Sequence, residues 1–192
     1  MSINVSTHAL ARNPLANILA YQFAWFACLF SAAHDKPWVG SAMALLVVAW
    51  HVSNANTPKT ELGLIIVSGV IGLLWETAIV QAGWVAYPSG NIIPGFAPHW
   101  IVALWLVFAT TFNVSLKWFK RHLTIVAVFG FLGGPIAFYA GSALGALTLT
   151  PTIGLTAIAI GWAVLMPIMM IIARQLDGYD LGDNNPTTID PR

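Results

Sequence analysis

The fold is decided by residues 61–83, which read ELGLIIVSGVIGLLWETAIVQAG. Apart from Glu61 at its start, the only charged residue in this stretch is Glu76. About 20 consecutive apolar residues in an α-helix cross the ~30 Å hydrocarbon core of a bilayer. In lipid every backbone N–H and C=O group must be bonded within the protein, and a helix achieves this within one segment. The stretch therefore predicts a transmembrane helix.

Five further stretches have the same character, and they cover residues 14–33, 38–56, 98–118, 123–146 and 152–174. The chain of 192 residues is 58% hydrophobic and only 8% charged, whereas a soluble domain carries about 25% charged residues. We therefore predict an all-α fold, a polytopic bundle of six transmembrane helices that occupies residues 14–174.

The lysines and arginines fall almost entirely on one side of this predicted bundle, and Lys36 alone falls on the other. The residues on the first side are Arg12, Lys59, Lys117, Lys120, Arg121, Arg174 and Arg192. Cytoplasmic loops carry the excess of Lys and Arg in membrane proteins. We therefore expect both termini in the cytoplasm, with residues 1–13 as a short N-terminal segment and residues 175–192 as a polar, disordered tail.

Polar side chains within the predicted helices form two sets, and the inner set lies near the cytoplasmic face. It contains His51, Glu61 and Asn113. Ionisable groups in a membrane are costly, usually face the bundle interior and often mark functional sites. We expect these three residues to carry acid–base chemistry, with Gln22 and Lys117 binding the substrate. The alternative is structural: Glu61 begins a helix, and Asn113 and Gln22 link helices.

The outer set centres on Glu76, the only acid well inside a predicted helix. At ~1.5 Å rise per residue, Tyr139 lies at a similar depth, which allows a Glu76–Tyr139 hydrogen bond. His99 and Tyr87 border this region from the loop of residues 84–100. We expect Glu76, Tyr139 and His99 to bind a substrate, with Glu76 as a candidate proton carrier. The alternative is a hydrogen-bonded glutamate with a purely structural role.

Several other kinds of site find no support in the sequence. Neither His-x-x-x-His nor His-Glu-x-x-His occurs, and Cys28 is the single cysteine, so we expect no metal site. Phosphate-binding loops, dinucleotide-binding glycine motifs and Gly-x-Ser-x-Gly are missing as well, and we expect no cofactor. A net charge of +1 argues against nucleic acid as a partner.

Small residues recur every four positions in the fifth predicted helix, at Gly133, Ala137, Gly141 and Gly145. Small residues allow helix backbones to approach closely in a membrane. We expect this stripe to serve packing within the chain. The alternative is a homodimer, or contact with another membrane protein, through the same stripe.

Several short patterns together resemble an uncharacterised bacterial inner-membrane family known as domain of unknown function 2878. The matching pieces are YQFAWF at 21–26, PKTEL at 58–62, PHW at 98–100, LWLVFATT at 104–111, NVSL at 113–116, GGP at 133–135 and YAG at 139–141. Glu76 departs from the aspartate expected in this family and keeps the acid. The resemblance implies a location in the bacterial inner membrane. The family's association with fatty-acyl modification genes hints at lipid chemistry, but the family brings no established activity.

Three functions follow from these observations, and the sequence leaves open whether the chain is an enzyme. The first is assisting or performing modification of membrane lipid, which would be the partner of the inner polar set. The second is a small proton-coupled transporter that uses Glu76. The third is a non-enzymatic scaffold held together by the small-residue stripe.

Overall fold

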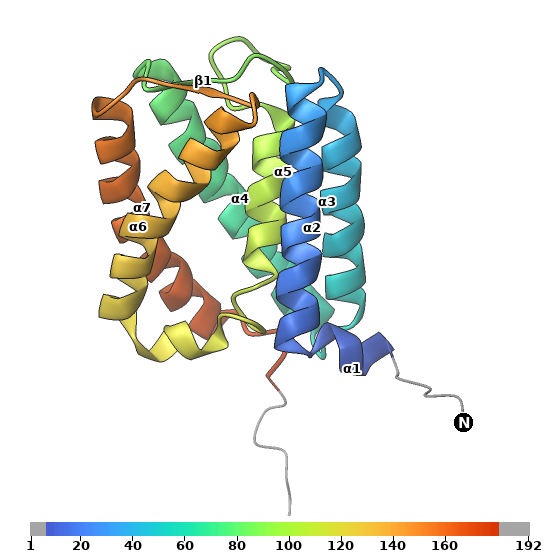
Figure 1. Cartoon of the computed structure of the whole chain (residues 1–192). Helices are drawn as coiled ribbons and strands as arrows, with labels where there is room; N and C mark the ends of the chain where they lie inside the picture. The colour runs from blue at the N-terminus through green and yellow to red at the C-terminus, as the bar shows by residue number, and fades with distance from the viewer. Residues whose placement is uncertain (1–6, 181–192) are drawn as a thin grey trace, which may run out of the picture.

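The structure, a computed structural model, describes residues 7–180, which form one helical bundle (Figure 1). Its helices are α1 (Thr7–Ala11), α2 (Pro14–Ala33), α3 (Pro37–Ser53), α4 (Pro58–Gln81), α5 (His99–Ala109), the 3₁₀ helix η1 (Lys117–Arg121), α6 (Leu123–Ala143) and α7 (Ile153–Gln175). Two short strands, β1 (Val85–Ala86) and β2 (Thr148–Leu149), pair antiparallel at one end. The all-α prediction is confirmed for this part of the chain.

Proline marks the start of three helices. Pro14, Pro37 and Pro58 each occupy the first position of α2, α3 and α4, where the missing N–H group has no partner in a helix anyway. Asn13 additionally caps α2, because its side-chain oxygen accepts hydrogen bonds from the backbone N–H groups of Leu15 and Ala16. These local preferences fix the helix boundaries close to those predicted.

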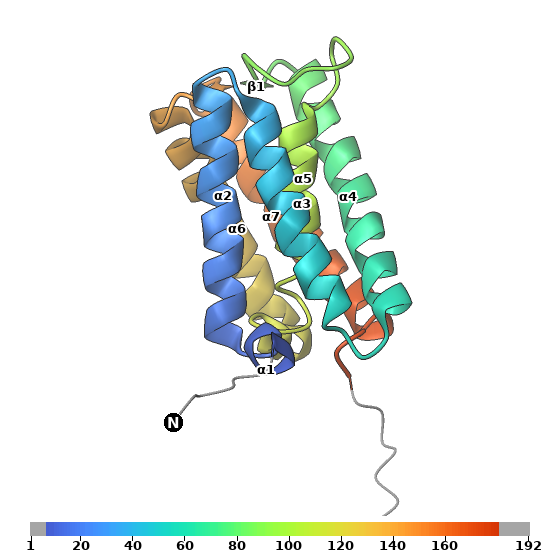
Figure 2. The same cartoon turned by 90° about the vertical axis from the view of Figure 1, so that its right-hand side faces the viewer.

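The helices form two groups. In the first group α5 packs against α2, α3 and α4, and α2 packs along α3. In the second group α6 and α7 form an antiparallel hairpin (Figures 1 and 2). The β1–β2 pair joins the two groups at one end, and η1 contacts α6 and α7 at the other. A cavity lined by residues of both groups lies between them.

The fourth predicted helix is shorter than expected. The sequence predicted a helix over residues 98–118, but α5 ends at Ala109, and residues 110–116 form turns that are mostly buried. The hydroxyls of Thr110 and Thr111 donate to the carbonyls of Val107 and Phe108, three residues earlier. Such side-chain bonds compete with the regular helix. Irregular backbone at membrane depth is tolerated where protein buries it.

Four helices of the described residues are long and apolar enough to cross a membrane, namely α2, α4, α6 and α7. Their outer faces are covered by large apolar side chains, including Leu74 and Ile136, which are 66% and 67% exposed. Soluble monomers rarely expose apolar surface on this scale. The chain is therefore a helical membrane protein. The apolar helices α3 and α5 are shorter, with 17 and 11 residues.

Glycine packing between α6 and α7 uses a different face from the predicted stripe. An added Cβ at Gly130 would lie 2.3 Å from the carbonyl oxygen of Trp162, and one at Gly134 would lie 2.5 Å from the Trp162 side chain. At Gly133, a stripe member, the nearest atom is a carbon of Phe129 at 4.0 Å. The close approach of these helices therefore depends on Gly130 and Gly134.

The adjacent glycines of α6 provide a matched test of this packing. We expect Gly134→Ala to lower the free energy of unfolding by ~1–3 kcal/mol, because overpacking forces Trp162 to move. Gly133→Ala should be neutral, or stabilising by up to ~1 kcal/mol, since alanine favours a helix. Thermal unfolding in detergent compares the two. Equal losses of stability in both variants would contradict the assigned packing face.

Candidate functional site

The inner site begins with a buried pair between two neighbouring helices. His51 lies near the end of α3 and Glu61 in the first turn of α4, and the short link between these helices brings both to the same end of the bundle. The distance from His51 Nε2 to Glu61 Oε1 is 2.8 Å, and both side chains are fully buried. A polar pair without solvent needs its remaining hydrogen bonds satisfied by the protein.

Asn113 supplies one of these bonds from the irregular segment after α5. Its side-chain N–H group donates to Glu61 Oε2 at 2.7 Å and to the carbonyl of Leu176 at 2.9 Å. Its side-chain oxygen accepts a hydrogen bond from Lys120 Nζ. The early end of α5 is what places Asn113 here. The structure thus brings together the three residues predicted as the inner set and adds a lysine.

The segment after α7 closes the site. The backbone N–H of Gly178 donates to Glu61 Oε2 at 3.0 Å, and the Gly178 carbonyl accepts from the N–H of Thr57 at 3.0 Å. The ring of Tyr179 packs on His51 with a centroid distance of 4.6 Å. The polar tail predicted from Gln175 onward therefore starts as a packed segment. Residues 181–192 of that tail lie outside the described residues.

Tyr179 also determines which atoms of His51 are accessible. Its hydroxyl lies 3.2 Å from His51 Nδ1 and donates to the His51 carbonyl at 2.7 Å. Burial, reinforced by the negative charge of Glu61, raises the pKa of Tyr179 above its ordinary value, so the hydroxyl stays protonated at neutral pH. Both ring nitrogens of His51 are thus occupied, by Glu61 and by Tyr179.

Lys120 connects this closed network to an open pocket. Its side chain is buried, and its Nζ lies 2.8 Å from Asp177 Oδ2. Beside it is a pocket of about 420 Å³ at the surface. The pocket is lined by Lys117, Trp118, Lys120, Arg121, Arg174, Asp177 and Asp180. Half of the chain's eight lysines and arginines therefore meet at this one place.

The two residues predicted to bind the substrate beside the inner set, Gln22 and Lys117, lie outside the network of His51, Glu61 and Asn113. Gln22 is exposed on the side of α2 and does not reach the network. Asn17, one turn earlier, is buried instead, and it donates to the Thr110 carbonyl and accepts from the Ser115 hydroxyl. Lys117 lies at the pocket, 54% exposed and 3.9 Å from Asp177.

The outer site differs from the predicted one in the partner of Glu76. Tyr139 is 66% exposed on the outer face of α6 and makes no hydrogen bond to Glu76. The carboxylate of Glu76 instead accepts from the Tyr87 hydroxyl at 2.6 Å and from Trp105 Nε1 at 3.0 Å. Burial, and next the charge of Glu76, raise the pKa of Tyr87. His99 lies apart, with its Nδ1 2.7 Å from the Ser41 hydroxyl.

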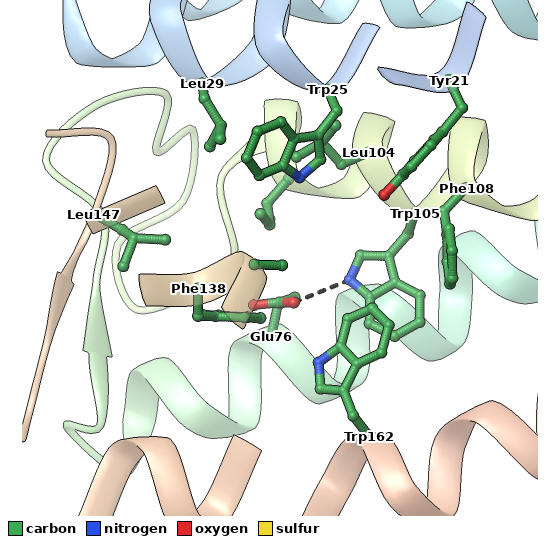
Figure 3. A pocket seen from close by; sticks show the side chains of 12 residues that line it. Tyr21, Trp25, Leu29, Glu76, Leu104, Trp105, Phe108, Phe138, Leu147 and Trp162 are labelled. Atoms are coloured by element: carbon green, nitrogen blue, oxygen red, sulfur yellow. Dashed lines mark hydrogen bonds between the residues drawn. The ribbon is translucent and has the colours of Figure 1, made fainter. Parts of the chain in front are cut away.

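A glycine makes this arrangement possible. An added Cβ at Gly72 would lie 2.1 Å from the Trp105 ring. Gly72 is one turn before Glu76 on the same face of α4, so the indole lies flat on the helix with its N–H group directed at the carboxylate (Figure 3). Within the described residues, no group of three or more His, Cys, Asp or Glu side chains could hold a metal ion.

Comparison with known proteins identifies one family. A family model described as "Protein of unknown function (DUF2878)" matches residues 14–168, which confirms the resemblance found in the sequence patterns. A search of curated proteins and a search of solved structures each give no match.

Gly178 tests how the closing segment is held. An added Cβ there would lie 2.5 Å from Glu61 Cβ and 2.8 Å from Glu61 Oε2. We expect Gly178→Ala to displace the segment, so that hydrogen exchange of the amides at 178–180 becomes about tenfold faster or more. A tenfold change corresponds to a loss of about 1.4 kcal/mol in the free energy of local opening. Gly63→Ala is the control, because a Cβ at Gly63 meets no atom within 4 Å. Unchanged exchange in Gly178→Ala would contradict the assigned contact.

Proposed function

We propose that this chain, which belongs to the family DUF2878, binds the phosphate-bearing headgroup of an anionic membrane lipid. The binding site would be the pocket beside Lys120, called the basic pocket below. The protein would span a bacterial inner membrane six times, with both termini in the cytoplasm. Headgroup binding would serve the modification of membrane lipid. The observation that carries the proposal is the pocket formed by η1, the end of α7 and the segment that follows it.

The distribution of charge supports this orientation. Arg12, Lys59 and Lys117 lie at the end of the bundle that holds the pocket, whereas Lys36 lies in the α2–α3 connection at the opposite end (Figure 1). Cytoplasmic ends carry this excess of positive charge. In the proposed arrangement α3 is a short span. The fourth crossing is completed by α5, ~16 Å long at 1.5 Å per residue, and by the buried turns that follow it.

The charges of the pocket suit a phosphate group. Its lining contains four positive and two negative side chains, a formal charge of +2, although the whole chain carries only +1. Arginine and lysine are the usual ligands of phosphate, through charge-assisted hydrogen bonds. Trp118, which is 57% exposed at the pocket, is of the residue type that is enriched at the headgroup level of membranes.

The buried hydrogen bonds from Glu61 through Asn113 to Lys120 hold one wall of the pocket in place. Lys120 is held between Asn113 and Asp177, and Asn113 is held in turn by Glu61. This chain of bonds fixes the position of a cation at the base of the pocket before any ligand arrives. Preorganised groups bind with a smaller loss of side-chain entropy.

This geometry favours binding over direct acid–base catalysis by the inner set. A general base must reach the proton that it removes, and both nitrogens of His51 are occupied by protein groups. Catalysis by His51 would require Tyr179 to leave. We therefore assign Glu61, His51 and Asn113 to positioning, and the exposed cations to the headgroup.

Lipid binding by the full-length protein in detergent tests the proposal. We expect a water-soluble short-chain phosphatidylglycerol to bind saturably, and the matching diacylglycerol, which lacks phosphate, to bind at least about tenfold more weakly. The double variant Lys117→Gln/Arg121→Gln should weaken phosphatidylglycerol binding by a similar factor, because both side chains are exposed at the pocket. Added salt should weaken it further.

Two comparisons make this test specific. Lys59→Gln removes an exposed cation at the same end of the bundle but outside the pocket, and it should leave binding unchanged. Inorganic phosphate is the second comparison, since competition by millimolar phosphate as strong as that by lipid would indicate a free-anion site. The proposal fails if phosphatidylglycerol and diacylglycerol bind equally, or if the pocket variant and Lys59→Gln bind alike.

A further inference from the structure

A second cavity lies between the two helix groups, toward the end of the bundle that is opposite the basic pocket. It has a volume of about 60 Å³, and five different helices contribute to its wall (Figure 3). α4 contributes Glu76, and aromatic side chains come from α2, α5, α6 and α7. The aromatic residues are Tyr21, Trp25, Trp105, Phe108, Phe138 and Trp162.

Within residues 7–180, the carboxylate of Glu76 has no positively charged partner. The residue is 1% exposed, and both of its oxygens accept from neutral donors, Trp105 and Tyr87. None of the salt bridges among the described residues involves it. A carboxylate in a low-dielectric interior is costly when it is unpaired. A cation in the adjacent space would offset that cost.

The wall of the cavity suits a particular kind of cation. Trp105 and Trp162 stack with centroids 5.0 Å apart, and Trp25 lies across the space from them (Figure 3). Indole faces attract cations such as quaternary ammonium groups, and Trp25 is the indole of this wall that lies outside the Trp105–Trp162 stack. A primary ammonium would bring three N–H donors into a space where Glu76 is the only charged acceptor. A quaternary ammonium brings none.

The size of the cavity agrees with this choice. One water-sized group needs about 10–15 Å³ in such a space, so 60 Å³ holds roughly four or five. A nitrogen with its methyl groups is of this size. An acyl chain or a sterol is much larger.

Access is open from the side of the bundle. Tyr21 and Trp25 on α2 and Ala137 on α6 are only partly buried, and α6 packs mainly on α7. Because α2 and α6 contact one another where Leu29 lies beside Gly141, the ligand would enter between these helices on the Tyr21 and Trp25 side of that contact. Glu76 lies five residues before the end of α4, which is ~7.5 Å along the helix axis.

We propose that this cavity is a binding site for a quaternary ammonium group, with Glu76 as the counter-ion and the indole of Trp25 as the aromatic contact. The site is distinct from the basic pocket and lies toward the opposite end of the bundle. The two proposals can therefore fail separately, because one ligand is a cation and the other an anion.

Calorimetric titration of the full-length protein, in a detergent without choline groups, tests the site with choline as the probe. Choline should bind saturably. Its neutral isostere, in which carbon replaces the nitrogen, should bind at least about tenfold more weakly. Glu76→Gln keeps the shape of the side chain and should weaken choline binding by about tenfold or more. Trp38→Phe, which alters an exposed indole outside the cavity, should bind choline as the unaltered protein does.

A second variant covers the case in which Glu76→Gln does not fold, as judged by circular dichroism and gel filtration. Trp25 is only partly buried, so Trp25→Leu should fold and still lose choline affinity by several-fold, through the lost cation–π contact. Absence of saturable choline binding overturns the proposal. Equal binding of choline and its neutral isostere, or undiminished binding by a folded Glu76→Gln or Trp25→Leu protein, overturns it as well.

Discussion

The carboxylate of Glu61 pairs with His51 through one oxygen and accepts from Asn113 and the Gly178 backbone through the other. These three partners come from α3, from the turns after α5 and from the segment after α7, so one buried group joins parts of the chain that are far apart in sequence. Removing one side of such a contact leaves the others unsatisfied, at about 1–3 kcal/mol for each buried polar group. The arrangement of the whole basic end depends on this group.

The sequence predicts the helices well because their signals are local. Proline at positions 14, 37 and 58 fixes helix starts, and apolar runs of 20 or more residues leave few alternatives. The end of α5 was missed because residues 98–118 are apolar enough for a span. The polar side chains at Thr110, Thr111 and Asn113 were the available evidence for a break, since such residues compete with helical bonds.

The sequence predicts how deep each candidate side chain lies in the membrane, but not whether it faces the inside or the outside of the helix bundle. Residue counting at a fixed rise places Glu76 and Tyr139 at similar depths, yet Gly130 and Gly134 turn α6 so that Tyr139 faces outward. For the same reason the sequence predicts Gln22 in the inner set, whereas Asn17 is the buried polar residue of α2. This helix is apolar around most of its circumference and shows no distinct inner face. Tyr179 was missed for another reason: it follows the last helix, in a stretch whose polar composition is typical of a disordered tail.

The two polar centres have opposite electrostatic character. At one end, cations surround an open pocket, and one of them, Lys120, is linked through Asn113 to a buried acid. Toward the other, a lone carboxylate faces aromatic rings in a cavity that opens to the side of the bundle. The central claim is that Glu61 acts on Lys120 through the Asn113 amide. A double-mutant cycle with Glu61→Gln and Lys120→Met, read as free energies of unfolding in detergent, tests it most directly. We expect a coupling energy of about 1 kcal/mol or more, whereas additivity within ~0.5 kcal/mol would show that the two residues act independently.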